Sequence, residues 1–224
     1  MGEVVAVIAT AKAAAEAADK IVGWYQNAKD AAATKEARDA ATLAYFGALL
    51  ASTVAALDVE FRTLATDIEE LDASWSDTQR AALADKAHAL AEREELIHRL
   101  DAATEFLRKR TNEPGWRQTI LHLGRGDKQL ADAVDELLQV GEEALRCVGA
   151  REKSTTPLGI EDVERKIRSA TEESEVAATK LWARDVLAAI DRMKVRSAHR
   201  AFGGFASVLS MRHGLPAPDW AIIF

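Results

Sequence analysis

Glu95 and His98 have the spacing by which two side chains of one helix bind a metal ion. In the E-x-x-H arrangement both ligands project from the same helical face, as in the di-iron centres of helical bundles. Such a centre needs a second E-x-x-H copy and two further glutamates, and the chain has a single copy. The single cysteine, Cys147, excludes a cysteine-cluster metal site. We therefore expect no metal ion and no other cofactor.

The segment Gly124-Arg-Gly-Asp-Lys128 has glycines before an expected helix, where exposed backbone NH groups can hold a phosphate. It lacks the G-x4-G-K-S/T spacing that makes a phosphate loop specific. The sequence favours an ordinary helix start here, with Asp127 as the capping residue.

Arginine and histidine recur in pairs at a spacing that is also found in catalytic sites. The R-x4-6-H pattern resembles that of HEPN ribonucleases, in which both side chains act on a scissile phosphate. The residue after the arginine is usually small and polar in that family, whereas here it is Glu94, Gln118 or Met193. An RNase therefore stands as an alternative function, and we expect no enzymatic activity because no other catalytic motif is present. The pairs are Arg93 and His98, Arg117 and His122, and Arg192 and His199.

Composition indicates the elements that would position these side chains. The chain has 224 residues, 29% of them charged, few β-branched residues and only four prolines, so we expect an all-α protein. Apolar residues at spacings of three and four predict an elongated antiparallel bundle of about five long helices plus short helices. Ser74 or Ser76 offers a helix cap, and Gly203 with Gly204 is expected to bend or end the last long helix. The long helices are expected at 3–30, 35–71, 81–110, 127–148 and 160–199, with a short one at 116–123.

The domain organisation follows from the same pattern. No repeat or low-complexity tract is visible, so residues 1–224 are expected to form a single helical-bundle domain. Glycines and a proline mark a possible subdomain junction at 112–126, and 150–159 is the best candidate for an exposed linker.

Glu3 and the absence of a basic stretch before the first apolar residues argue against a signal peptide. Together with the single cysteine, this indicates the cytoplasm.

Residues 40–57, AATLAYFGALLASTVAAL, contain no formal charge. Eighteen residues is at the lower limit for a membrane span, and the Ala, Gly, Ser and Thr content makes the stretch only marginally apolar. We interpret it as the central helix of a bundle, which would meet a bilayer only under particular conditions. Its small residues suit close contact between helices.

Positive charge gathers near the C-terminal end, from Arg192 to Arg200, and is followed by apolar residues. This arrangement is compatible with an anionic membrane surface. Pairing of this basic region with the acidic stretch 58–72 inside the same molecule is the favoured alternative. Nucleic acid is an unlikely ligand, because the net charge is −7 and no aromatic platform accompanies the basic residues.

The segment Trp220 to Phe224 ends in three bulky apolar residues. It either packs into a groove of its own bundle, which we favour, or inserts into a partner as a short linear motif. Together with the N-terminal apolar residues and the basic region it supplies the candidate membrane or partner contacts. These are Val4, Val5, Ile8, Arg192, Lys194, Arg196, Arg200, Phe202, Phe205, Trp220, Ile222, Ile223 and Phe224.

The first sixty residues resemble the HeLo and MLKL-type helical bundles of cell-death and immune effectors. The similarity lies in Val4-Val-Ala-Val-Ile8, in the aromatic and polar cluster from Ile21 to Asn27, and in the small-residue run Gly47-Ala-Leu-Leu-Ala51. The resemblance implies an effector that, once triggered, exposes an apolar helix, oligomerises and damages a membrane. Our first functional expectation is such a conditionally membrane-active effector, located in the cytoplasm or peripherally at the membrane. The alternative is an adaptor module that binds a protein partner, or itself, through its helical faces and apolar tail.

Overall fold

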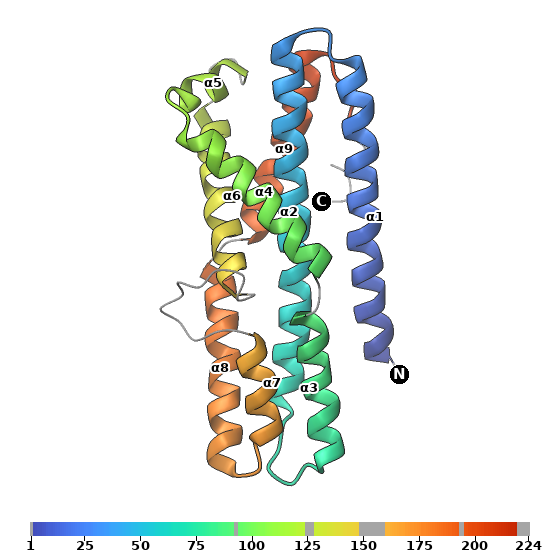
Figure 1. Ribbon diagram of the computed structural model, residues 1–224, viewed down its shortest axis with the longest axis vertical. Coiled ribbons are helices and arrows are strands. Elements are labelled where there is room, and N and C mark those ends of the chain that lie inside the picture. Colours follow the sequence, from blue (N-terminus) through green and yellow to red (C-terminus); the bar gives the residue numbers. More distant parts are fainter. Residues whose placement is uncertain (1, 92–93, 124–127, 148–159, 193–194, 219–224) are drawn as a thin grey trace. The chain divides into compact units, whose positions relative to one another are not determined.

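The computed structural model describes residues 2–91, 94–123, 128–147, 160–192 and 195–218 (Figure 1). In these ranges the regular structure is entirely helical, which confirms the all-α prediction. The helices are α1 (Gly2–Ala31), α2 (Lys35–Glu69), α3 (Asp77–Ala91), α4 (Glu94–Asn112), α5 (Trp116–Leu123), α6 (Lys128–Cys147), α7 (Ile160–Ser169), α8 (Glu173–Arg192) and α9 (Val195–His213).

The chain divides into two compact units built from interleaved segments. Unit 1 comprises Met1–Ala56, Arg99–Glu142 and Lys194–Phe224, and unit 2 comprises Leu57–His98 and Glu143–Met193. The expected junction at 112–126 falls inside unit 1, away from the boundaries between the units. The expected linker at 150–159 lies outside the described residues, and the single-domain organisation stays a prediction.

Unit 1 begins with an antiparallel hairpin of α1 and the first part of α2. Thr34 starts α2, because its hydroxyl accepts a hydrogen bond from the backbone NH of Ala37 at 3.1 Å. Many alanines line the core, which lets the helices approach closely. The largest fully buried side chains of this unit are Ile21, Leu50, Leu100, Leu107 and Leu137.

One close approach lies at Gly141 of α6. A Cβ atom built there would lie 2.7 Å from Thr104 Oγ1 and 2.8 Å from Leu50 Cδ1, less than real Cβ atoms tolerate. Leu50 and Thr104 are both fully buried. The absence of a side chain at Gly141 therefore lets α6 pack tightly against α2 and α4.

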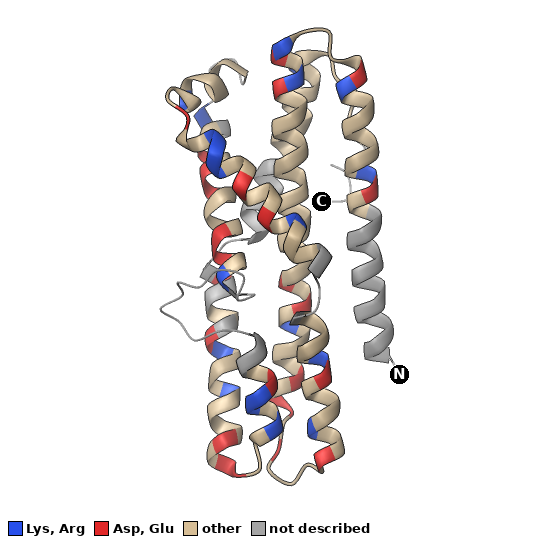
Figure 2. Cartoon of the chain, in the orientation of Figure 1, with Lys and Arg blue, Asp and Glu red and all other residues tan. Residues whose placement is uncertain are grey.

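The uncharged stretch 40–57 lies within α2. By length and composition α2 can cross a membrane, and 78% of its most apolar eighteen-residue window is buried inside the protein. In Figure 2 charged residues mark both ends of α2, and its middle is almost free of them. This burial agrees with the interpretation of the stretch as a central core helix.

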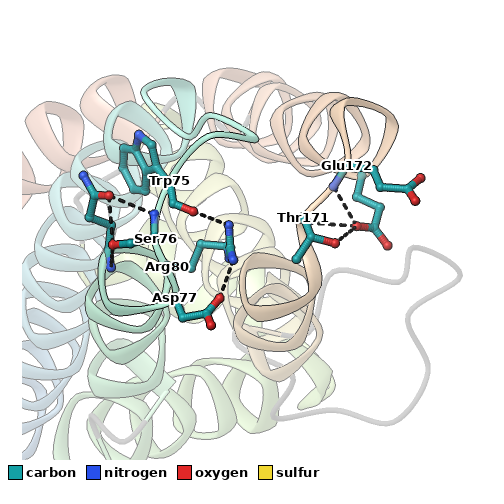
Figure 3. Close-up of polar contacts among 8 residues, drawn as sticks. Trp75, Ser76, Asp77, Arg80, Thr171 and Glu172 are labelled. Carbon is teal, nitrogen blue, oxygen red and sulfur yellow. Dashed lines mark hydrogen bonds and ion pairs between the residues drawn. The ribbon is translucent and has the colours of Figure 1, made fainter.

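Unit 2 contains the second part of α2 together with α3, α7 and α8. Ser76 caps α3, because its hydroxyl accepts from Gln79 N at 3.3 Å while Gln79 Oε1 accepts from Ser76 N at 2.9 Å. The buried Arg80 secures the preceding turn by donating to the Trp75 carbonyl at 2.5 Å and to Asp77 (Figure 3). The predicted cap at Ser76 is confirmed.

The helix expected at 81–110 falls on α3 and α4, and because residues 92–93 lie outside the described part its continuity stays a prediction. The helix expected at 160–199 is replaced by shorter helices. It is interrupted after α7, where Glu175 accepts hydrogen bonds from the backbone NH groups of Thr171 and Glu172 at 2.9 and 3.2 Å (Figure 3). These bonds start α8 at Glu173, so the prediction of one long helix is wrong here.

The pair Gly203 and Gly204 neither ends nor interrupts α9, contrary to expectation. The helix continues to His213 and stops at Gly214, whose φ of 65° is favourable only for glycine. The NH of Leu215 then bonds to the carbonyl of Ser210 at 2.9 Å, and Leu215 is buried. This Schellman motif is the true end of the helix.

Glu175 gives unit 2 a testable pH dependence. The NH donors of Thr171 and Glu172 hold the pKa of the Glu175 carboxyl below its ordinary value. Its contribution to stability is therefore present above the unfolded pKa, roughly 4.3, and is lost as the pH falls through the folded pKa. In urea denaturation, the advantage of the wild type over Glu175→Gln is expected to shrink from neutral pH toward pH ~3. An advantage that grows in acid would contradict the prediction.

Candidate functional site

Among the side chains that the structure describes, those expected to carry chemistry do not form a common site. His98 is exposed, and the side chain of Glu95 lies outside the described part. Among the described residues, no three or more His, Cys, Asp or Glu side chains are grouped so that they could hold a metal ion.

The Arg117 and His122 pair lies on α5, where both side chains are exposed. Arg117 donates to Asp132 at 3.0 Å and to Asp135 at 3.3 Å, so its guanidinium connects α5 to α6. Two carboxylates therefore already accept hydrogen bonds from the guanidinium that would have to bind a scissile phosphate. Gly124–Asp127 and the side chains of Arg93, Arg192 and His199 lie outside the described part.

Of the predicted membrane or partner contacts, Phe205 has a described side chain. It is 2% exposed and belongs to the core of unit 1, so it is not a surface contact in this structure. The other predicted contacts have no described side chain. Val4, Val5 and Ile8 fall in α1, Arg192 in α8, and Arg196, Arg200 and Phe202 in α9, while Lys194, Trp220, Ile222, Ile223 and Phe224 fall in undescribed segments.

Acids of the stretch 58–72 are partly neutralised within unit 2 by arginines outside the basic region 192–200. The side chains of that basic region lie outside the described part, so its pairing with the acidic stretch stays a prediction. Arg184 of α8 donates to both carboxylate oxygens of Glu69, at 2.7 and 2.9 Å. This bond is the main reason why the pKa of Glu69 lies below its ordinary value. The guanidinium of Arg62 donates a hydrogen bond to Asp58 at 2.9 Å and another to Asp191 of α8 at 2.6 Å. These pairs explain the mixture of charges on the helices of this unit in Figure 2.

A groove in unit 1 is the strongest candidate for a binding site. It encloses about 410 Å³ that is open to solvent, between the first part of α2, the second half of α4, and α5. The turn from Glu113 to Trp116 positions α5, because Gly115 adopts a φ of 77° and Trp116 N bonds to the Glu113 carbonyl at 3.0 Å. The lining residues are Asp39, Leu43, Phe106, Arg110, Glu113, Trp116, Thr119, Ile120 and Leu123.

The floor of the groove is apolar and two of its walls are aromatic. Leu43, Ile120 and Leu123 are buried, whereas Phe106 and Trp116 are partly exposed. Apolar surface that remains open to water at such a site favours the binding of another apolar group.

A line of aromatic rings extends from the groove across α4, α2 and α1. Phe106 stacks on Phe46 with ring centroids 3.9 Å apart, Phe46 meets Tyr45 edge to face at 5.0 Å, and Tyr45 stacks on Tyr25 at 4.3 Å. All four rings are partly exposed. Burial beside Tyr25 raises the pKa of Tyr45, which keeps its hydroxyl neutral. The line is therefore an uncharged aromatic strip.

The polar rim of the groove is formed by Asp39, Arg110, Glu113 and Thr119. Arg110 donates to both oxygens of Glu113, at 3.1 and 3.3 Å, and its guanidinium carbon lies 5.5 Å from the centre of the Phe106 ring. Within the described ranges no ion pair involves Asp39. The rim thus presents a carboxylate beside apolar and aromatic surface.

The groove residues were not among the contacts predicted from the sequence. Its one sequence signal is the Pro114-Gly115 turn, which was interpreted only as a break between helices. No protein-family model, curated protein or solved structure matches this chain.

Proposed function

We propose that this chain is a protein interaction module that binds a segment of a partner protein in the groove of α2, α4 and α5. The observation that carries the proposal is an open groove that combines an apolar floor with the partly exposed aromatic walls Phe106 and Trp116. Aromatic side chains are enriched at protein interfaces, where a few of them supply most of the binding energy.

The groove has the chemistry of a peptide site, because its lining is mainly apolar and aromatic with a few polar groups at the rim. Burial of apolar surface stabilises a complex by roughly 25 cal/mol per Å² before ordering costs. The aromatic strip of Phe46, Tyr45 and Tyr25 extends the same face of unit 1 and offers further contact area.

Selection of a random peptide library displayed on phage against the full chain tests the proposal. We expect selected peptides to lose about tenfold or more in affinity for Trp116→Ala, measured by fluorescence anisotropy, because a hot-spot aromatic is worth about 2 kcal/mol. Trp75→Ala removes a similarly exposed tryptophan of unit 2 and is the matched control. Peptides that bind Trp116→Ala as well as the wild type would refute the groove as the binding site.

A conditionally membrane-active effector is a second candidate function, and the composition of α2 favours it. This helix is long and apolar enough to cross a bilayer, and the HeLo and MLKL-type resemblance of the first sixty residues points the same way. Because most of the apolar stretch is buried, α2 would have to leave the core before it met lipid.

Dye release from liposomes containing anionic lipid tests this second function. We expect no release from the folded protein and release from variants that loosen unit 1, such as Leu50→Ala. Liposomes of neutral lipid alone are the control for the contribution of the basic region. Absence of both binding and leakage under all these conditions would remove the membrane hypothesis.

A further inference from the structure

We infer that the partner segment carries a lysine or arginine next to apolar residues, and that this cation lies against Asp39 in the groove. The inference rests on the proposed function, since it concerns the same groove. It adds the chemical class of the ligand, which follows from how the charges of the rim are distributed.

The only guanidinium in the lining is already engaged. Arg110 donates to Glu113 through Nη1 and stacks over Phe106, so its charge is compensated within the protein. Of the two carboxylates in the lining, Glu113 is therefore compensated by Arg110, and Asp39 forms no ion pair with any described residue. The groove has an uncompensated negative charge.

Asp39 is well placed to attract a cation strongly. It is partly buried on α2, at the edge of an apolar surface, where an ion pair is screened less than in open water. A lysine or arginine has an aliphatic stem that can pack on apolar surface while its charged end meets the carboxylate. The face of Trp116 adds a cation–π attraction of about 0.5–2 kcal/mol when the cation lies over the ring.

The same charges exclude other ligands. An acidic peptide would bring a carboxylate next to Asp39 and Glu113, and like charges at an interface cost several kcal/mol. An anionic lipid headgroup would meet the same repulsion. An uncharged apolar peptide would leave Asp39 desolvated and without a partner, which costs free energy. A protein segment with both apolar and basic residues fits the whole groove, because its apolar side chains can pack on the floor and walls while its cation pairs with Asp39 at the rim.

A double-mutant cycle on a selected peptide tests the inference. The probes are a peptide from the library selection that contains lysine or arginine, and the same peptide with norleucine at that position. On the wild-type chain, norleucine is expected to weaken binding about tenfold, since one such charge pair is lost. On Asp39→Asn the two peptides should bind equally well. Asp19→Asn, an exposed acid of α1 outside the groove, should retain the wild-type difference.

The outcomes separate this inference from the proposed function. If selected peptides depend on Trp116 but contain no basic residue, or show no coupling to Asp39, the groove binds peptides and the inference is wrong. If binding is independent of Trp116, or no peptide is selected, both are wrong. Circular dichroism of Asp39→Asn and Trp116→Ala confirms that each variant is folded, so a loss of binding reports on the groove.

Discussion

Gly141→Ala is expected to lower the free energy of unfolding by about 1–2 kcal/mol, although alanine favours helices over glycine by about 1 kcal/mol. The new Cβ would lie 2.7 Å from Thr104 Oγ1 and 2.8 Å from Leu50 Cδ1. Neither atom can move easily, because both side chains are fully buried and the Thr104 hydroxyl donates to the Leu100 carbonyl at 2.7 Å. Overpacking therefore outweighs helix propensity.

Gly23→Ala is the matched control for this prediction. Gly23 is an exposed glycine inside α1, and a Cβ there would meet nothing within 4 Å. Only the helix propensity acts, so this variant should gain about 0.5–1 kcal/mol. Both variants are measured by urea denaturation followed by circular dichroism. If Gly141→Ala stabilised the protein as much as Gly23→Ala does, the close approach of α6 would be disproved.

Leu50→Ala is expected to have the largest effect, a loss of about 2–5 kcal/mol in the free energy of unfolding. Leu50 is fully buried on α2 and its methyl groups lie under Gly141, so removing them leaves a cavity in a tightly packed part of unit 1. Leu181→Ala, at a leucine that is 58% exposed, should change stability by less than about 0.5 kcal/mol.

The two sites should also be coupled. In Leu50→Ala the space that a Cβ at position 141 needs becomes free, so adding Gly141→Ala should cost much less than it does in the wild type, or even stabilise the protein. Contacting residues typically show interaction energies of about 0.5–3 kcal/mol in such cycles. Strict additivity of the two losses would show that the two side chains do not share this space.

The long helices were predictable because local patterns determine them. The apolar periodicity of 3–30 and 35–71 corresponds closely to α1 and α2, and the Pro114-Gly115 turn correctly separated α5 from α4. Ser76 was a recognisable cap because a small hydroxyl residue preceded an apolar periodic run.

The break between α7 and α8 could not be predicted from glycine or proline, because neither occurs there. It depends on Glu175 reaching back to the NH groups of Thr171 and Glu172, and an acid at this spacing is common inside helices as well. At Gly203 and Gly204 the sequence predicted a bend or an end of the helix, but α9 continues through both residues. Each glycine weakens a helix by only about 1 kcal/mol.

The groove could not be predicted because its lining combines α2 with α4 and α5, which are far from α2 in the sequence. Asp39 of α2, Phe106 of α4 and Trp116 of α5 meet only after the turn at Gly115 has set the direction of α5. Each residue taken alone looks like an ordinary surface acid or core aromatic. The absence of an ion pair at Asp39 is likewise a tertiary property, since Lys35 and Arg38 are close to it in sequence.

The interleaving of the two units has a consequence for synthesis on the ribosome. The segments of unit 2 are complete once Met193 has emerged, whereas unit 1 still lacks α9 and its core residues Phe205 and Leu209. At a synthesis rate of about 5–20 residues per second, several seconds pass between the emergence of the uncharged part of α2 and the emergence of α9. We therefore expect unit 2 to fold first and the nascent chain to depend on chaperones that bind apolar helices until α9 completes unit 1.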